Sequence, residues 1–157
     1  MKKLKVTIIG YGGMGSFHAK LIQANPEVEV HGIFDILESR QQAGEADGYS
    51  AYASLEEALN DACADTILMA TPNDVHKEIA VQALEAGKHV ICEKPVTLNS
   101  EELSEIMHTA KEHERVFMVH QNRRWDSDFQ MVKDLYENRK IGEVFHIESR
   151  VQGANGI

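Results

Sequence analysis

The chain has 157 residues, 43% of them hydrophobic and 26% charged, which is the composition of a soluble globular protein large enough to bury a core. Its 16 Lys and Arg residues against 25 Asp and Glu residues give a net charge of -9, and this argues against nucleic-acid partners, which require basic clusters. With no long apolar stretch, no signal-peptide pattern and only two cysteines, Cys63 and Cys92, we expect a cytoplasmic protein with no membrane partner.

Short β-branched runs alternate along the chain with longer segments in which apolar residues recur at spacings of three and four. This alternation predicts an α/β fold, a doubly wound parallel sheet with helices on both faces. Right-handed crossovers favour the strand order 3-2-1-4-5-6. We expect strands at 4–9, 28–34, 49–52, 66–70, 89–92 and 116–120, and helices at 14–24, 37–45, 55–60, 74–86, 100–114 and 127–137.

Two helix ends carry recognisable signals. Asn99, or Ser100 beside it, is suited to accept a hydrogen bond from the first amides of the helix that follows. Gly87 stands where a left-handed residue would close the preceding helix.

The end of the chain follows a different pattern. Apolar residues alternate with polar ones between Val144 and Val151, which predicts a half-exposed strand at 144–151. No residues follow in this sequence to cover that strand. We therefore divide the chain into one domain at 1–122 and the first elements of a second, truncated α+β domain at 123–157.

The clearest motif is the run VTIIGYGGMG, in which a predicted strand leads into Gly10, Gly12 and Gly15 and then into a predicted helix. The G-x-G-x-x-G spacing at a strand-to-helix turn indicates dinucleotide binding. Gly10 permits the tight turn, Gly12 lets a diphosphate approach the backbone, and Gly15 lets the helix pack close to the strand. A plain flexible loop could contain the same three glycines. The dinucleotide-binding interpretation therefore needs a second observation, at the end of the next predicted strand.

Asp35 supplies that support, because it ends the second predicted strand 20 residues after Gly15. A carboxylate at this place accepts hydrogen bonds from an adenosine ribose diol and would repel a 2′-phosphate, which favours NAD over NADP. Arg40, five residues further on, leaves NADP open. The preferred explanation of Arg40 is a solvated helix-surface charge near Glu38.

Two more segments follow predicted strands and so fall at the sheet edge where this fold binds ligands. In ATPNDVH, Thr71 and Asn73 can line a bound cofactor, although Asn73 or Asp74 would also serve as a helix N-cap. In CEKP, Glu93 and Lys94 directly follow an apolar strand, a costly place for charges unless they pair with each other or with a ligand.

In their order and separation, the runs GYGGMG with Asp35, ATPNDVH, GKHVICEKPVTLN and QNRRWDSDF resemble the Gfo/Idh/MocA family, the glucose-fructose oxidoreductase and inositol 2-dehydrogenase group. The resemblance covers the whole chain, and EKP is its most specific part. It implies NAD(P)-dependent transfer of hydride between a hydroxyl of a sugar, inositol or related polyol and the nicotinamide. It also implies that the full-length protein is a homo-oligomer.

The resemblance assigns roles to individual residues. Lys94 is expected to be catalytic by orienting the substrate. The expected cofactor-binding residues are the three glycines, Asp35 and Arg40, together with Tyr11, Met14, Thr71, Asn73, His76, Glu93, Lys94 and Arg123. The family's catalytic histidine would come after residue 157, so we expect this chain to be an N-terminal portion that lacks the catalytic base.

Other possibilities remain at this stage. A dinucleotide-binding module or sensor without turnover needs the same glycines and acidic residue, and S-adenosylmethionine-dependent methyltransferases share that pairing as a weaker alternative.

No metal site is predicted, since His108 and His113 are five residues apart and fall on different faces of a helix. His120 ends a predicted strand, where it either faces the ligand or is satisfied by the protein itself.

Overall fold

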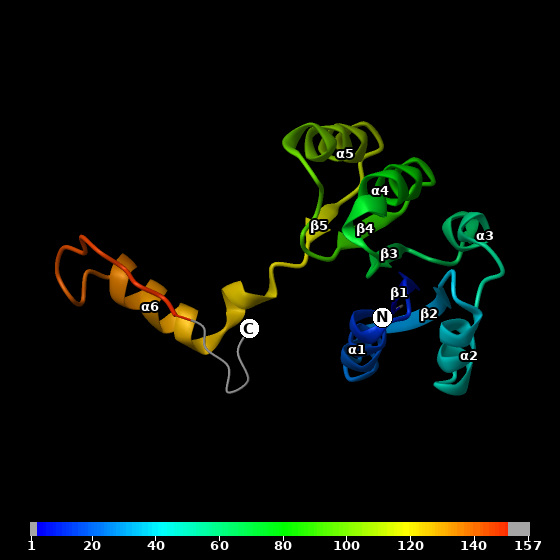
Figure 1. Cartoon of the computed structure of the whole chain (residues 1–157), viewed down its shortest axis with the longest axis horizontal. Coiled ribbons are helices and arrows are strands. Elements are labelled where there is room, and N and C mark those ends of the chain that lie inside the picture. The colour runs from blue at the N-terminus through cyan, green and yellow to red at the C-terminus, as the bar shows by residue number, and fades with distance from the viewer. Residues whose placement is uncertain (1–2, 151–157) are drawn as a thin grey trace. The chain divides into compact units, whose positions relative to one another are not determined.

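The computed structural model describes residues 3–150, and the chain divides after His120 into two compact units (Figure 1). The first unit contains all five strands of the described chain: β1 (Leu4–Ile9), β2 (Val28–Phe34), β3 (Thr66–Met69), β4 (His89–Cys92) and β5 (Phe117–Val119). Its helices are α1 (Gly13–Gln23), α2 (Glu38–Ala46), α3 (Leu55–Asn60), η1 (Asn73–Val75), α4 (His76–Glu85) and α5 (Ser100–Glu112). The second unit contains η2 (Asn122–Trp125) and α6 (Ser127–Glu137).

The strands form one parallel sheet in the order β2-β1-β3-β4-β5, which confirms the predicted α/β fold. Adjacent residues of β1 point to opposite sides of this sheet. Ile9 joins a core with residues of α3, α4 and α5, while Ile8 joins a second core that includes Ala19 of α1. Helices therefore pack on both faces of the sheet, as the unbroken apolar strands predicted.

The predicted strand at 49–52 is wrong. These residues touch the outer edge of β2 through a single bridge, between Ile33 and Ala51, rather than a ladder. The chain cannot continue along β2, because Ser54 begins α3 by accepting a hydrogen bond from the Glu57 amide at 3.1 Å. The bridge nevertheless occupies the sheet position that the predicted strand order gave to the third strand.

The helices begin and end close to the predicted residues. Asn99 accepts a hydrogen bond from the Glu102 amide at 2.9 Å, and Gly87 has a φ of 76°, so both predicted end signals are confirmed. The described residues include no helix that is long and apolar enough to cross a membrane.

The glycine turn brings β1 and α1 into close contact. Gly10 has a φ of 91°, and a Cβ on it would lie 2.6 Å from the carbonyl oxygen of Ala70. A Cβ on Gly15 would lie 1.9 Å from the carbonyl oxygen of Gly10. Side chains at these two positions would overlap backbone atoms, so the predicted structural roles of Gly10 and Gly15 are confirmed.

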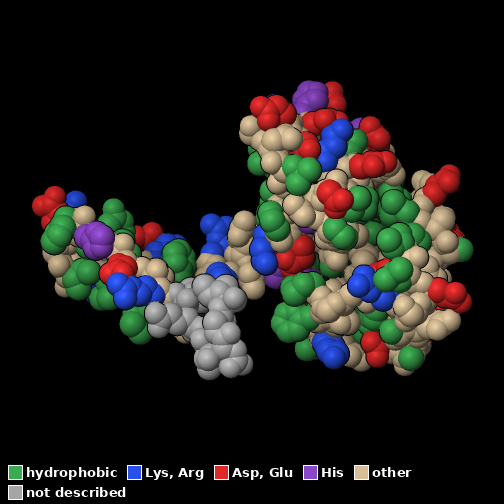
Figure 2. Space-filling model, viewed as in Figure 1, with side chains coloured by type: hydrophobic (Ala, Val, Ile, Leu, Met, Phe, Trp, Pro, Cys, Tyr) green, Lys and Arg blue, Asp and Glu red, His purple; other side chains and the backbone are tan. Residues whose placement is uncertain are grey.

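The second unit is helical over the expected residues 127–137, and α6 buries none of its side chains. Apolar side chains such as Phe129, Val132 and Tyr136 are exposed among charged ones, as the unit containing α6 shows in Figure 2. The strand predicted at 144–151 is wrong over 144–150, which have no regular structure; Val151 lies outside the described residues. A strand needs a hydrogen-bonded neighbour, and these residues have none within the described chain.

The two glycines of the α1 N-terminus offer a matched test of this packing. We expect Gly15→Ala to lower the free energy of unfolding by about 3 kcal/mol, because its Cβ must displace backbone. Gly13→Ala should have no cost or a gain of about 0.5 kcal/mol, since no atom beyond the neighbouring residues and the backbone of α1 lies within 4 Å of its Cβ position, and alanine favours the helix. Urea denaturation of both variants measures this difference, and equal stabilities would contradict the close approach of α1 to β1.

Candidate functional site

The candidate site lies at the carboxyl ends of the parallel strands, where the glycine turn, Asp35 and the segments after β3 and β4 meet at one edge of the sheet. A largely apolar cavity of about 490 Å³ opens there, a size suited to part of a cofactor. Its walls come from the segments at the ends of β1, β2 and β3 and from α2 and α4, and include Gly10, Asp35, Ile36, Leu37, Arg40, Thr71, Pro72, Val75 and Ile79.

Asp35 is held in place at the floor of this cavity. Its Oδ2 accepts a hydrogen bond from the Tyr11 amide at 2.8 Å, and its Oδ1 accepts one from the Leu37 amide at 2.9 Å. The Arg40 guanidinium lies 3.4 Å from Oδ2 and is half exposed. The carboxylate that Arg40 pairs with is therefore Asp35, not Glu38, while its guanidinium remains exposed to solvent on the surface of α2.

Gly12 and Met14 lie on the open side of the glycine turn. A Cβ on Gly12 would meet only the flexible Arg40 side chain, at 3.4 Å, and Met14 is exposed.

Tyr11 differs, because its ring is buried and packs edge-on against Tyr49. Its hydroxyl donates to Asp47 at 2.8 Å, and burial together with this contact raises the Tyr11 pKa. Tyr11 therefore contributes its backbone, not its side chain, to the turn.

Thr71 and Asn73 follow β3. The Oγ1 of Thr71 is buried without a hydrogen-bond partner among the described residues, and Thr71 lines the cavity. An unsatisfied hydroxyl at a cavity wall fits the presence of a polar ligand. The alternative of a helix N-cap at Asn73 or Asp74 is wrong, because neither η1 nor α4 has a side-chain cap.

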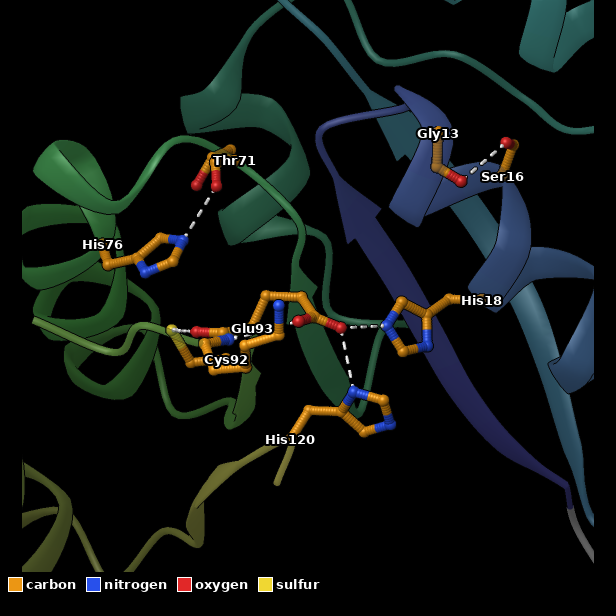
Figure 3. A network of polar contacts seen from close by, with 9 residues as sticks. Gly13, Ser16, His18, Thr71, His76, Cys92, Glu93 and His120 are labelled. Carbon is orange, nitrogen blue, oxygen red and sulfur yellow. Dashed lines mark hydrogen bonds and ion pairs between the residues drawn. The ribbon is translucent and has the colours of Figure 1, made fainter. Parts of the chain in front are cut away.

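His76 begins α4 and joins two loops. It is 1% exposed, and its Nε2 lies 2.9 Å from the Thr71 carbonyl oxygen (Figure 3). Its Nδ1 lies 3.0 Å from the carbonyl oxygen of Pro95 and 3.2 Å from that of Val96. The buried ring thus braces the two loops, and the contact of His76 with a cofactor that the resemblance implied stays a prediction.

Glu93 lies between two histidines at the end of β4 (Figure 3). His18 Nε2 and His120 Nδ1 donate to the same carboxylate oxygen, Oε1, at 2.7 and 2.8 Å, and the Lys94 amide donates to Oε2 at 3.2 Å. Glu93 is 6% exposed. Burial acts to raise its pKa, but these three donors outweigh burial and hold the Glu93 pKa below its usual value.

The two charges of the EKP run thus do not pair with each other. Glu93 is satisfied by histidines and backbone, whereas the Lys94 side chain is exposed at the sheet edge and forms no ion pair with Glu93. Arg123 belongs to the second unit, where its exposed guanidinium lies 3.3 Å from Asp126.

Sequence reasoning missed His18. It lies three residues beyond Gly15 on α1 and 75 residues before Glu93, and nothing in that spacing indicates their contact. One feature of the sequence could have indicated this contact: a charged residue directly after an apolar strand needs a buried hydrogen-bond partner. A polar residue on the helix that follows the glycine turn could have been considered as that partner. The structure also brings His31, Asp61 and Cys63 together, with ligand-type atoms within 4.8 Å of one another.

A parallel α/β sheet with a G-x-G-x-x-G turn, an acidic residue ending β2 and a cavity between them defines a dinucleotide-binding Rossmann domain. The family model described as "Oxidoreductase family, NAD-binding Rossmann fold" matches residues 4–121, and the chain belongs to this family, Gfo/Idh/MocA. Its cofactor is accordingly NAD, with NADP also possible.

Known proteins resemble this chain over nearly its whole length. It is 34% identical to a scyllo-inositol 2-dehydrogenase (NADP(+)) of Bacillus subtilis, over 90% of this chain and 39% of that protein. An NAD-binding protein of Listeria innocua has a structure with a TM-score of 0.94 and 56% identity, over 99% of this chain and 46% of that one. GenD2 from gentamicin A biosynthesis, solved with NAD, has a TM-score of 0.84 and 28% identity, over 89% and 40%. The chain spans less than half the length of each.

The lowered pKa of Glu93 predicts how its contribution to stability depends on pH. Above the ordinary glutamate pKa of 4.5, the ionised carboxylate should stabilise the fold, so Glu93→Gln should lose about 1–3 kcal/mol at neutral pH. As the pH falls through the lower pKa of the folded state, wild-type Glu93 is protonated and the difference between the two proteins should shrink.

Urea denaturation of both proteins between about pH 7 and pH 3 measures this difference, with Glu85→Gln, an exposed position on α4, as the control. A difference that stays constant or grows toward acid pH would contradict the lowered pKa.

Proposed function

We propose that this chain is the cofactor-binding portion of an NAD(P)-dependent oxidoreductase of the cytoplasm. The single observation that carries this proposal is the cavity at the glycine turn, lined by Asp35 and by Thr71, whose hydroxyl has no hydrogen-bond partner among residues 3–150. Apolar walls suit an adenine ring, the Asp35 carboxylate suits the hydroxyls of the attached ribose, and the Thr71 hydroxyl suits a polar group on the other side of the cofactor. The proposal places residues 1–122 in the dinucleotide-binding domain and 123–157 at the start of a substrate and dimerisation domain.

Each part of the site has a role in this proposal. The backbone of the turn at Gly12 and the first amides of α1 hold the diphosphate, because a helix N-terminus attracts anions. Asp35 binds the adenosine ribose, and Thr71 and Asn73 line the other side of the cofactor. Lys94 extends from the strand edge to orient the substrate. Tyr11, His76 and Glu93 support these segments from within the fold.

The proposed substrate is a sugar, inositol or related polyol, which reacts at one of its hydroxyl groups. The support for this class is the naming of several relatives as inositol dehydrogenases, among them the scyllo-inositol enzyme of Bacillus subtilis and a myo-inositol 2-dehydrogenase of Thermotoga maritima. When bound, the nicotinamide accepts or gives the hydride. We assign the proton-accepting base and the walls that enclose the substrate to the length of those relatives that this chain does not span.

The glycine turn provides the test of cofactor binding. Titration of the chain with NADH, followed by fluorescence, should give saturable binding that Gly12→Ala weakens by tenfold or more, because the new methyl group lies where the diphosphate approaches. Glu85→Ala is the control, since Glu85 is an exposed residue at the end of α4 and has no part in the proposed site, and it should bind as the wild type does.

A wild-type chain that ignores NADH and NADPH but binds S-adenosylmethionine would reverse the proposal in favour of a methyltransferase. Binding of NADH that is equally strong in Gly12→Ala would place the cofactor elsewhere on the chain.

Asp35 and Arg40 determine the expected choice between the two nicotinamide cofactors. We expect NAD to bind more tightly than NADP, because the Asp35 carboxylate repels a 2′-phosphate and Arg40 is already paired with it. Asp35→Ala should weaken NAD binding by about 1–3 kcal/mol and narrow or invert the preference. Calorimetric titration with both cofactors measures this, and a wild-type preference for NADP would show that Arg40 dominates.

A further inference from the structure

The most unusual polar group of the described chain is Glu93 with its two histidines, and the proposed cofactor contacts do not use it. The donors come from three separate elements: His18 from α1, His120 from the residue after β5, and the Lys94 amide from the turn itself. The His18 and His120 rings also meet edge to face, with centroids 4.6 Å apart. Figure 3 shows the carboxylate pointing into the gap between them.

The hydrogen bonds determine where the protons are. A carboxylate oxygen only accepts, so His18 must carry its proton on Nε2 and His120 on Nδ1. Each imidazole is therefore held in one tautomer, and Glu93 is held as an anion with both oxygens occupied. Because Glu93 is buried, losing either imidazole leaves an underpaired carboxylate that must find water or rotate away.

Backbone hydrogen bonds to the neighbouring strands also hold the end of β4 in place. The Glu93 amide donates to the Met69 carbonyl at 3.0 Å, and the His120 amide donates to the Cys92 carbonyl at 2.8 Å. Lys94, by contrast, is exposed, and its amide is bonded only through the Glu93 side chain among the described contacts. The peptide that carries Lys94 is thus held by the Glu93 carboxylate at its N–H, while its carbonyl oxygen, that of Glu93, accepts from Cys92 Sγ at 3.3 Å.

We propose that His18 and His120 are positioning residues for Lys94. They fix the Glu93 carboxylate, which in turn fixes the Lys94 amide and the direction in which the lysine side chain leaves the sheet edge. His18 lies on the helix that begins at the glycine turn, so the same contact fixes the Lys94 turn relative to the diphosphate-binding segment. This inference deepens the proposed function and rests on it.

The same three side chains are a possible metal-ligand set, since their donor atoms lie within 4.8 Å of one another. The distances favour hydrogen bonds, because both nitrogens lie at 2.7 and 2.8 Å from a single oxygen. Ligands around a tetrahedral zinc ion are separated by roughly 3.3 Å, given Zn–N bonds of about 2.0 Å. Zinc binding at this cluster is accordingly an outcome that would overturn the proposal.

The Lys94 amide provides a direct readout through native-state hydrogen exchange of the 157-residue chain. We expect His18→Ala and His120→Ala each to speed its exchange by roughly tenfold, the loss expected from one charged hydrogen bond. His18→Gln and His120→Asn place an amide N–H near the lost Nε2–H and Nδ1–H, and should keep exchange near the wild-type rate. His31→Ala, which removes a 3.0 Å contact with Asp61, is the matched control and should leave Lys94 unchanged.

Three results would overturn the positioning role. The first is unchanged Lys94 exchange in the alanine variants, and the second is faster exchange spread evenly over the sheet amides, as general destabilisation produces. The third is tight binding of Zn²⁺ by the wild-type chain that His18→Ala removes.

NADH titration of the same samples separates this inference from the proposed function. A wild-type chain that fails to bind NADH would refute the function alone, whatever the exchange rates. Normal NADH binding with unchanged Lys94 exchange in His18→Ala would refute the positioning role alone.

Discussion

The close contact between α1 and the end of β1 controls the geometry of the whole site. With hydrogen atoms at Gly10 and Gly15 in place of side chains, the helix can lie against the strand with its N-terminus at the turn. The free amides of the first turn then face the edge where the parallel strands end. The same placement carries His18, one turn further along α1, to Glu93 at the end of β4. One steric constraint therefore positions both the anion-binding turn and the polar group beneath Lys94.

Buried polar groups at this edge follow a common pattern. Asp35 is satisfied by two backbone amides and Glu93 by two imidazoles and an amide, and the ring nitrogens of His76 face carbonyl oxygens of two loops. Burial alone would make each of these side chains costly. Satisfied by fixed partners, they hold the surrounding loops in one arrangement and leave the solvent-facing groups, such as Lys94 and Met14, free for a ligand.

Local sequence signals predicted most of the first unit. The glycine spacing, the apolar runs and the helix-capping residue Asn99 depend on neighbours in the chain, and the corresponding elements lie where the pattern placed them. The strand predicted at 49–52 and the described part, 144–150, of the other predicted strand were wrong because a strand exists only with a partner, and the alternation of residues does not reveal one. The partners of Glu93 were equally hidden, since side chains that meet across 75 and 27 residues leave no periodic trace.

The ring of His76 bridges the loop after β3 and the loop after β4 through three backbone carbonyls. Main-chain atoms make these contacts, so they survive changes in the side chains at Thr71 and Val96 but respond to any change in the path of either loop. Substitutions in the two loops should therefore be energetically coupled rather than additive. During evolution, the sequences of the two loops would therefore change together, because only loop paths that keep their carbonyl oxygens within reach of the His76 ring preserve these contacts.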